Sequence, residues 1–395
     1  MSEWQTVAIG EICDLVTSGG TPLTSQKEYY HNGSIPWVKT KEVNQCRLYG
    51  TENHITQLGL DNSSAKLIPE NSIIIAMYGD GKTAGRVALN KVPVTTNQAC
   101  CNLILNKQKA NYDFVFYNLM GRYDELVSKK TGSGQQNLNG KIIKEIEIDL
   151  PPLPEQKAIA SVLSSLDDKI DLLHRQNKTL EAMAETLFRQ WFIEEAKEDW
   201  VNVQLKDIVK QIKPGTNYQP KRLDSGIPFL NVRNLQNGQI NLQGISFISQ
   251  EEYERVHKAW KPEEGDVLIS RIGTLGIVAV LGKRDMPMAV HYNMLVLKPS
   301  LTNTAFLYFL LRSQYFQEAY SSKARQSVQE YVAVEDAESI ELKLPLNDAA
   351  FANKQDEFYC LFDKIRANLY QIQTLENLRD TLLPKLMSGE VRVQY

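Results

Sequence analysis

The sequence contains one run that resembles a phosphate-binding loop, Tyr78-Gly79-Asp80-Gly81-Lys82-Thr83. A nucleotide-binding P-loop needs the spacing G-x-x-x-x-G-K-[ST] between a strand and a helix. The first glycine would stand at position 76, which is Ala76, so a nucleotide site is not expected. The glycines around Lys82 would still let the backbone approach a phosphate closely, as in contacts with nucleic acid.

The other groupings that could do chemistry are incomplete. A methyltransferase of DNA amino groups would need an [N/D/S]-P-P-[Y/F] motif, but leucine stands on both sides of Pro151-Pro152. Glu341-Leu342-Lys343, with Asp336 upstream, is the nearest approach to a magnesium-dependent nuclease, and a pattern this short can arise by chance. The histidines and cysteines show neither H-E-x-x-H nor C-x-x-C spacing. We therefore predict no catalytic centre and no bound metal in this chain.

Other polar side chains suit the recognition of DNA. Base edges are read chiefly by Arg, Lys, Asn and Gln, while contacts with phosphates position the protein. Residues of these types, with nearby hydroxyl and aromatic groups, occur in loop-like stretches of both halves of the chain. In the first half the candidates are Thr21, Lys39, Lys41, Tyr78, Lys82, Arg86, Gln135, Gln136 and Asn137. In the second half they are Arg222, Arg233, Asn234, Arg271, Thr274, His291, Tyr292, Arg325, Gln326 and Gln329. The alternative is that most of them are solvated loop residues.

The elements that must position these residues occur twice. Gly20-Thr21 recurs as Gly215-Thr216, and Ile35-Pro36-Trp37-Val38 recurs as Ile227-Pro228-Phe229-Leu230. Nearly constant offsets of 195 and 192 residues predict two copies of one unit. In each copy, short apolar β-branched runs separated by Gly, Asn and Pro predict strands joined by loops.

Each copy becomes helical in its last third. Apolar residues then follow one another at alternating spacings of four and three, which is typical of a coiled-coil seam. The first seam reads Ile159, Leu163, Leu166, Ile170, Leu173, Asn177, Leu180, Ala184, Leu187 and Trp191. The second reads Phe358, Leu361, Ile365, Asn368, Ile372, Leu375, Arg379, Leu382 and Leu386. Two such seams would pack on each other, and a buried Asn in each would fix their register. Ordinary amphipathic core helices are the alternative, although roughly 30 residues, about 45 Å, is long for them.

The composition limits the class of protein. A hydrophobic content of 43% is ordinary for a globular protein, and no stretch has the roughly 18 apolar residues that span a bilayer. The absence of a signal sequence and of a disulfide pattern predicts a reducing, cytoplasmic location. The net charge is −3, with 10 acidic and 6 basic residues in 151–199 but 17 basic and 15 acidic residues in 200–345. A DNA-binding surface must therefore be a local patch.

Four motifs, in this order, resemble those of the specificity subunit of Type I restriction-modification enzymes. They are Ser18-Gly19-Gly20-Thr21-Pro22, Ile35-Pro36-Trp37-Val38-Lys39, Pro151-Pro152-Leu153-Pro154-Glu155-Gln156 and Leu382-Leu383-Pro384-Lys385-Leu386-Met387-Ser388-Gly389-Glu390. The resemblance covers nearly the whole chain. It implies an α+β fold with strand-rich target-recognition domains at 1–150 and 200–350. Two long helices, at 151–199 and 351–395, would separate these domains and pair as an antiparallel coiled coil, giving a pseudo-twofold internal duplication.

The resemblance also implies a function. Each recognition domain would read one half of a bipartite, asymmetric site in double-stranded DNA, and the helices would set the spacer. The expected partners are two DNA methyltransferase (modification) subunits and the restriction (endonuclease and translocase) subunits. AdoMet, ATP and Mg²⁺ would belong to those partners, with no cofactor in this chain. The second copy departs from the family pattern after Pro345-Leu346, where the matching glutamine is delayed to Gln355, so the start of its helix is open.

Two other interpretations compete with this one. The chain could be a self-contained restriction nuclease with a degenerate active site. It could also be a coiled-coil interaction scaffold whose strand-rich parts bind peptides rather than DNA.

Overall fold

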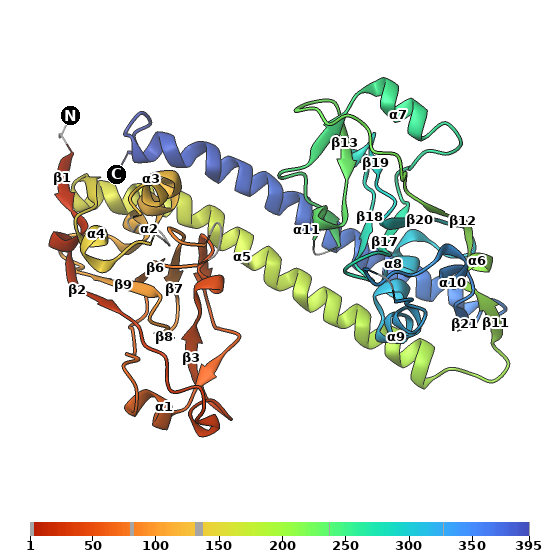
Figure 1. Ribbon diagram of the computed structural model, residues 1–395, viewed down its shortest axis with the longest axis horizontal. Coiled ribbons are helices and arrows are strands. Elements are labelled where there is room, and N and C mark those ends of the chain that lie inside the picture. Colours follow the sequence, from red (N-terminus) through yellow and green to blue (C-terminus); the bar gives the residue numbers. More distant parts are fainter. Residues whose placement is uncertain (1–3, 80–82, 131–136, 237, 327, 395) are drawn as a thin grey trace. The chain divides into compact units, whose positions relative to one another are not determined.

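The computed structural model describes residues 4–79, 83–130, 137–236, 238–326 and 328–394. The chain divides into two compact units, Met1–Leu172 with Gln371–Tyr395 (unit 1) and Leu173–Tyr370 (unit 2). Two long helices, α5 (Leu153–Arg189) and α11 (Ala350–Met387), each contribute one stretch to both units (Figure 1). No helix in the described part of the chain has the length and apolar character needed to cross a bilayer.

Unit 1 is built on a five-stranded sheet of order β2-β9-β6-β7-β4, with a smaller sheet β5-β3-β8 and the pair β1-β10. Its strands are β1 (Gln5–Ala8), β2 (Cys13–Ser18), β3 (Ile35–Val38), β4 (Cys46–Leu48), β5 (His54–Ile55), β6 (Ile73–Ala76), β7 (Val87–Asn90), β8 (Thr95–Thr96), β9 (Cys100–Leu105) and β10 (Glu147–Leu150). Its helices are η1 (Ile9–Ile12), η2 (Lys27–Tyr29), η3 (Thr40–Glu42), α1 (Gln57–Asp61), α2 (Tyr112–Gly121), α3 (Tyr123–Ser128) and α4 (Gly140–Lys144).

Unit 2 repeats this plan with the sheets β12-β20-β17-β18 and β16-β13-β19 and the pairs β11-β21 and β14-β15. Its strands are β11 (Val201–Gln204), β12 (Val209–Pro214), β13 (Ile227–Leu230), β14 (Leu235–Gln236), β15 (Gln239–Ile240), β16 (Ser246–Ile248), β17 (Val267–Ser270), β18 (Val278–Val280), β19 (Ala289–Val290), β20 (Met294–Pro299) and β21 (Glu341–Leu344). Its helices are η4 (Gln190–Glu194), α6 (Leu205–Ile208), η5 (Val232–Asn234), α7 (Gln250–Val256), η6 (Lys283–Asp285), α8 (Thr304–Arg312), α9 (Gln314–Ser322) and α10 (Val334–Glu338).

The central strands are apolar throughout because both of their faces are covered. In β6, Ile73 and Ile75 join the core formed with α2, whereas Ile74 joins the core beside β3. In β17, Val267 packs toward α8 and Leu268 packs toward the opposite face. Alternate side chains of a strand point to opposite faces, so burial on both faces selects a continuous apolar run.

The backbone hydrogen bonds correct the predicted alignment of the two copies by one residue. The N–H of Gly19 donates to the Cys100 carbonyl (3.2 Å), as that of Gly215 donates to the Met294 carbonyl (3.0 Å). Gly20 is therefore equivalent to Thr216, and the predicted match of Gly20 with Gly215 is wrong. A Cβ atom at Gly19 or Gly215 would lie 2.1 or 2.3 Å from a carbonyl oxygen of the facing segment, so both positions require glycine.

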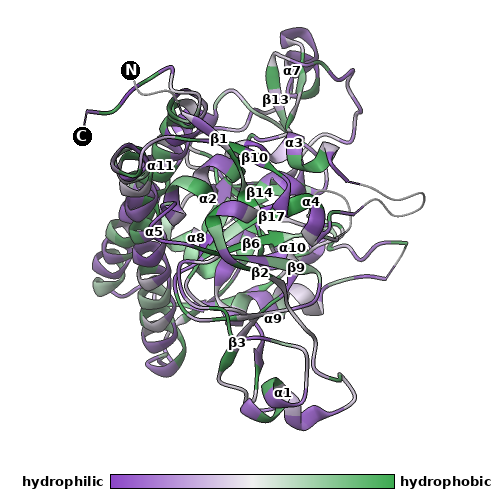
Figure 2. Ribbon diagram, turned by 90° about the vertical axis from the view of Figure 1, so that its left-hand side faces the viewer, coloured by the Kyte–Doolittle hydropathy of each residue, from purple (hydrophilic) through white to green (hydrophobic). Residues whose placement is uncertain are grey.

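The long helices are amphipathic, with hydrophilic and hydrophobic residues on different faces (Figure 2). The predicted seam residues that are buried are Ile159, Leu163, Ile170, Leu173, Asn177, Ala184, Phe358, Ile365, Asn368, Ile372 and Leu386. Those that are half-buried are Leu166, Leu180, Leu187, Trp191, Leu361, Leu375, Arg379 and Leu382. In unit 2 the Nδ2 group of Asn368 donates to Oδ1 of Asn177 (2.8 Å), which joins the two polar interruptions.

The second long helix begins at Ala350. Its Gln355 makes the same kind of hydrogen bond as Gln156 makes in the first long helix. Oε1 of Gln156 accepts from the backbone N–H of Asn111 (2.8 Å), and Oε1 of Gln355 accepts from that of Asn303 (2.7 Å). Both asparagines cap the helix that follows them, α2 or α8. The delayed glutamine thus keeps its contact although its place in the sequence pattern has moved.

Candidate nucleic-acid interface

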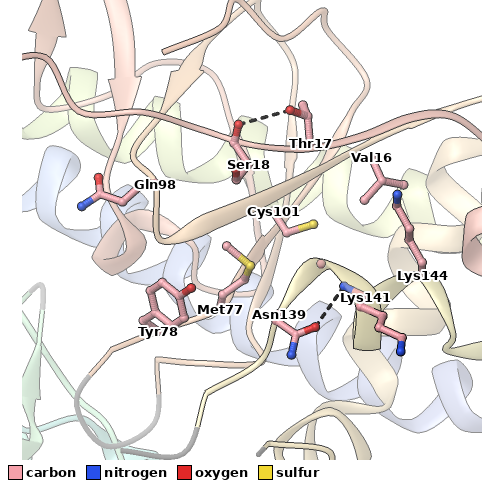
Figure 3. A pocket seen from close by; sticks show the side chains of 11 residues that line it. Val16, Thr17, Ser18, Met77, Tyr78, Gln98, Cys101, Asn139, Lys141 and Lys144 are labelled. Atoms are coloured by element: carbon pink, nitrogen blue, oxygen red, sulfur yellow. Dashed lines mark hydrogen bonds between the residues drawn. The ribbon is translucent and has the colours of Figure 1, made fainter. Parts of the chain in front are cut away.

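Unit 1 contains a pocket of about 400 Å³ where the ends of β2 and β6 and the start of β9 meet α4 (Figure 3). Val16, Met77 and Cys101 supply its apolar wall. The polar lining comes from Thr17, Ser18, Tyr78, Gln98, Asn139, Lys141 and Lys144. Lys141 and Lys144 lie on one side of the pocket, with Tyr78 and Gln98 on the other. A cavity with apolar walls and a few convergent polar groups is typical of a binding site.

The pocket is positively charged. Asn139 caps α4, because its Oδ1 accepts from the backbone N–H groups of Lys141 and Ile142 (3.0 Å each). Lys141 and Lys144 are exposed, and neither forms an ion pair with any carboxylate in the described ranges. Burial raises the pKa of Cys101 to about 12, so its thiol is neutral at pH 7 and does not offset the lysines. The arrangement can hold an anionic group.

Of the predicted DNA-contacting residues of unit 1, Tyr78 lines this pocket and Thr21 contacts one of its lining residues. Tyr78 is part of its lining and is 37% exposed. The hydroxyl of Thr21 donates to Oε1 of Gln98, another lining residue. Asn137 lies two residues before Asn139, next to Leu138, whose N–H donates to the Met77 carbonyl (3.1 Å). Lys82, Gln135 and Gln136 lie outside the described residues.

The remaining candidates of unit 1 are not among the lining residues, and each has a partner within the unit. Nζ of Lys39 donates to Oδ1 of Asn53 (3.0 Å) and lies 5.2 Å from the centre of the Trp37 ring. Lys41 forms an ion pair with Glu52. Arg86 donates to Oδ1 of Asn44.

In unit 2, four of the predicted residues belong to one cluster that includes Phe229. The guanidinium carbon of Arg222 lies 3.9 Å from the centre of the Phe229 ring, and His291 meets that ring edge-on at 5.7 Å. Tyr292 lies 4.5 Å from His291, centre to centre. Arg233 is close enough for its charge to help lower the pKa of Arg222, after the larger effect of desolvation. Neither arginine is ion-paired with any residue that the structure describes.

The surroundings of His291 favour its neutral form. Desolvation lowers its pKa from the ordinary value and the positive charge of Arg222 lowers it further, whereas the side chain of Asn293 raises it. Nδ1 accepts from the backbone N–H of Asn293 (3.4 Å), so the proton is on Nε2. His291 can therefore donate one hydrogen bond through Nε2.

A second group in unit 2 is joined by backbone hydrogen bonds between 271–273 and 330–332. The Nε group of Arg271 donates to the Val332 carbonyl (2.9 Å), and Gln326 donates to Glu330 (2.7 Å). Arg325 holds both carboxylate oxygens of Asp336, at 2.6 and 2.8 Å. Asp336, the upstream acid of the nuclease-like grouping, is thus engaged in an ion pair. Thr274 and Gln329 are exposed in the same two segments.

Asn234 does not belong with these candidates. It is 2% exposed, its Oδ1 accepts from the Asn231 N–H (3.1 Å), and its Nδ2 donates to the Asn241 carbonyl (3.1 Å). Both ends of the amide satisfy buried backbone groups, so the prediction of a DNA contact for Asn234 is corrected to a structural role.

Sequence reasoning did not identify six polar residues of the pocket, which are Thr17, Ser18, Gln98, Asn139, Lys141 and Lys144. A signal for the last three exists in the sequence, since Asn139 is a preferred N-cap residue and two lysines follow three positions apart on one helical face. No local signal marks Gln98, because its place at the pocket depends on the pairing of β9 with β2 and β6.

Comparisons with known proteins agree on one family. The family model described as "Type I restriction modification DNA specificity domain" matches residues 1–182 and again residues 197–374. Two relatives from Methanocaldococcus jannaschii, the Type I restriction enzyme MjaIX and MjaVIII specificity subunits, are 29% and 25% identical. Both alignments cover 99% of this chain and 94% of the relative.

A solved structure has the same fold. The S subunit of a Type I restriction-modification system from M. genitalium superimposes with a TM-score of 0.60 at 19% sequence identity. The match covers 97% of this chain and 96% of that chain.

Proposed function

The chain belongs to the Type I restriction modification DNA specificity family, and from this premise we propose that it reads a bipartite DNA site, one half with each unit. The family membership makes it a specificity subunit rather than a catalytic one. The observation that carries the proposal is a shared backbone frame with different side chains. The N–H of Met77 donates to the Ala99 carbonyl (2.8 Å), and that of Arg271 donates to the Asn293 carbonyl (2.9 Å).

This equivalence pairs unlike residues at the site. Gln98 of unit 1 corresponds to Tyr292 of unit 2, one position before Ala99 and Asn293. Because base readout depends on the donors and acceptors of single side chains, two units with one frame and unlike side chains are suited to different base sequences. We therefore expect the chain to recognise one asymmetric DNA site with two specified halves.

The same membership supports a proposal about partners. Relatives of this chain are named as specificity subunits of Type I restriction enzymes. This chain would accordingly assemble with two DNA methyltransferase subunits and with restriction subunits, and those partners would bind AdoMet, ATP and Mg²⁺. The ligand class of this chain itself is double-stranded DNA.

We further propose that the long helices set the spacer between the two halves of the DNA site. At 37 and 38 residues they extend about 55 Å each, at about 1.5 Å per residue. Inserting one heptad into both helices should lengthen the preferred spacer. An unchanged spacer would exclude this role for the helices.

Selection from a pool of random duplexes tests the proposed function. The full chain, alone and with its methyltransferase subunits, is used to retain bound DNA, which is then sequenced. We expect a motif with two short specified blocks separated by bases of any type. Loss of all sequence preference in both conditions would favour a non-DNA scaffold. Cleavage or methylation of plasmid DNA by the chain alone would show that it is an enzyme.

A further inference from the structure

Two short helices at equivalent places in the units carry opposite charges. Helix α4 reads Gly-Lys-Ile-Ile-Lys and helix α10 reads Val-Glu-Asp-Ala-Glu. The N–H of Ile9 donates to the Ile146 carbonyl, and that of Leu205 donates to the Ile340 carbonyl, both at 2.9 Å. Each bond lies just beyond its helix, so Lys141 corresponds to Glu335 and Lys144 to Glu338.

The surroundings of α10 do not reverse this difference. Arg325 pairs with Asp336 of α10, and the two carboxylate oxygens offset its charge. Arg271, which stands where Met77 stands in unit 1, donates from Nε to the Val332 carbonyl and keeps its charge, so α10 with its three acidic residues faces two cations, of which Arg325 is paired. Glu335 is exposed, and an anionic group placed beside it and Glu338 would be repelled.

The cations beside the smaller sheets, β5-β3-β8 and β16-β13-β19, also differ. In unit 1, Lys41 beside β3 is paired with Glu52, whereas Lys39 lies over the Trp37 ring, donates to Asn53 and has no carboxylate partner in the described ranges. In unit 2, Arg222 covers the Phe229 ring of β13 and Arg233 follows the same strand. Neither arginine has a carboxylate partner within the described ranges. Two exposed lysines without a carboxylate partner therefore lie on α4 in unit 1, where unit 2 has acidic residues, and two arginines of this kind lie beside β13 in unit 2.

We infer that the pocket beside α4 binds a phosphodiester group of the DNA backbone through Lys141 and Lys144, and that unit 2 instead holds the backbone with Arg222 and Arg233. The inference rests on the proposed function and adds that the two units grip the DNA backbone at non-equivalent places. Lysine ammonium groups bind phosphate as point charges, and such contacts position a protein without reading bases. The rim residue Tyr78 is placed to pack against the adjoining sugar.

The salt dependence of binding tests this inference. Each phosphate contact contributes about 0.9 to the slope of log K against log salt for duplex DNA. The full chain with its methyltransferase subunits is titrated with cognate and half-site-altered duplexes at several salt concentrations. We expect K141Q/K144Q to reduce the slope by about 1 to 2, and R222Q/R233Q to do the same. The ratio of cognate to altered-site affinity should stay unchanged for K141Q/K144Q, because a phosphate contact carries no sequence information.

A matched control is Lys107→Gln, which removes an exposed lysine just beyond the far end of β9 from the pocket. It should leave the slope unchanged. A K141Q/K144Q slope equal to that of the wild type or of the control would overturn the inference, as would a changed affinity ratio with an unchanged slope. If the wild-type complex shows no sequence preference, the proposed function fails instead, and the slope on any duplex still decides whether the lysines bind phosphate. Unchanged melting temperatures would show that the exposed substitutions leave the fold intact.

Discussion

The main sheets of the two units share the order of four strands, β2-β9-β6-β7 and β12-β20-β17-β18, but the units hold their stretches of the long helices by different contacts. In unit 1 a polar network adds to the apolar packing of Ile159, Leu163 and Leu383. Arg47 of β4, whose side chain is 2% exposed, pairs with Asp168 of α5 and donates to the hydroxyl of Tyr117 (2.9 Å). Tyr117 donates to Asp167 (2.7 Å), which also accepts from Arg379 of α11 (2.9 Å).

In unit 2 the contact consists of packed aromatic rings together with the ion pair between Arg312 of α8 and Glu181 of α5 (3.1 Å). Rings from α5, η4, α8 and α11 pack with centres 5.1 to 6.2 Å apart, and they belong to Phe188, Phe192, Phe306, Phe309 and Phe358. The two units therefore share a backbone frame. The side chains that fasten the helices, like those that line the site, have diverged without changing the shared order of four strands.

The largest expected effect comes from the aromatic contact. Phe358→Ala should destabilise unit 2 by about 3 to 5 kcal/mol, because Phe358 is 0% exposed and its removal leaves a cavity among five neighbouring rings. Hydrogen exchange resolves the units separately. Amides of β17 and β20 should lose protection while those of β6 and β9 keep theirs, and equal losses in both would contradict independent fastening.

A substitution in the polar network of unit 1 should cost less stability than Phe358→Ala costs in unit 2. Arg47→Met should destabilise unit 1 by about 2 kcal/mol, since Tyr117 and Asp167 lose a charged partner. The effect is moderated because the side chain of Asp168 is 69% exposed and stays hydrated. Arg47→Lys keeps the charge without the fork of donors and should lose less. Denaturation of the full chain measures both variants, and an Arg47→Met variant as stable as the wild type would show that the network is dispensable.

Acid should destabilise unit 2 by an amount similar to the effect of Arg47→Met on unit 1. His257 of unit 2 is 1% exposed, and desolvation lowers its pKa to about 4 from a usual value near 6.5, aided by Lys261 and opposed by a backbone bond with Trp260 and by Glu254. Below pH 6.5 the unfolded chain takes up a proton that the folded unit does not, so stability is lost as the pH falls toward 4. At pH 5 the loss is about 2 kcal/mol.

The control for this prediction is His257→Phe, which should remove most of the pH dependence between 6.5 and 5 and leave the part that His291, whose pKa is also lowered by desolvation, contributes. In unit 1 the described histidines, His31 and His54, are exposed and half-buried. Hydrogen exchange at pH 6.5 and 5 should therefore show weakening in unit 2 alone. Weakening of both units, or persistence of the full effect in His257→Phe, would contradict the assignment to His257.

The smallest expected effect concerns the asparagine pair of unit 2. Asn368→Ala should cost about 1 to 2 kcal/mol, because Oδ1 of the buried Asn177 loses its donor. Replacing both residues with Leu should recover that stability or exceed it while loosening the register of the helices. If the double variant is less stable than Asn368→Ala, the pair contributes packing rather than register.

Much of the frame could be predicted from the sequence because it depends on local patterns. The segment 151–199 was predicted to contain the first long helix, which spans Leu153–Arg189, and the resemblance to the specificity subunits is confirmed by the family match. Alternating spacings of four and three select a helix with one buried face wherever they occur. The buried strands were visible as β-branched runs such as Ile73-Ile74-Ile75.

The site was harder to predict because it depends on contacts between distant segments. Asn234 has the residue type of a base reader but satisfies buried backbone groups, which only the fold reveals. Asp167 does not fit an apolar seam, yet it is buried because Tyr117 and Arg379 reach it. Lys141 and Lys144 share one helical face in the sequence, but they line a pocket only because α4 packs beside the ends of β2 and β6.

The central claim is that each unit reads one half of the DNA site, and substitutions at one equivalent position in both units test it most directly. Gln98→Ala in unit 1 and Tyr292→Ala in unit 2 are each assembled with the methyltransferase subunits, and the bound motif is determined from random duplexes. We expect each substitution to make bases degenerate in one half of the motif, a different half for each variant, and to leave the other half unchanged. Relaxation of both halves by either substitution, or of the same half by both, would contradict it.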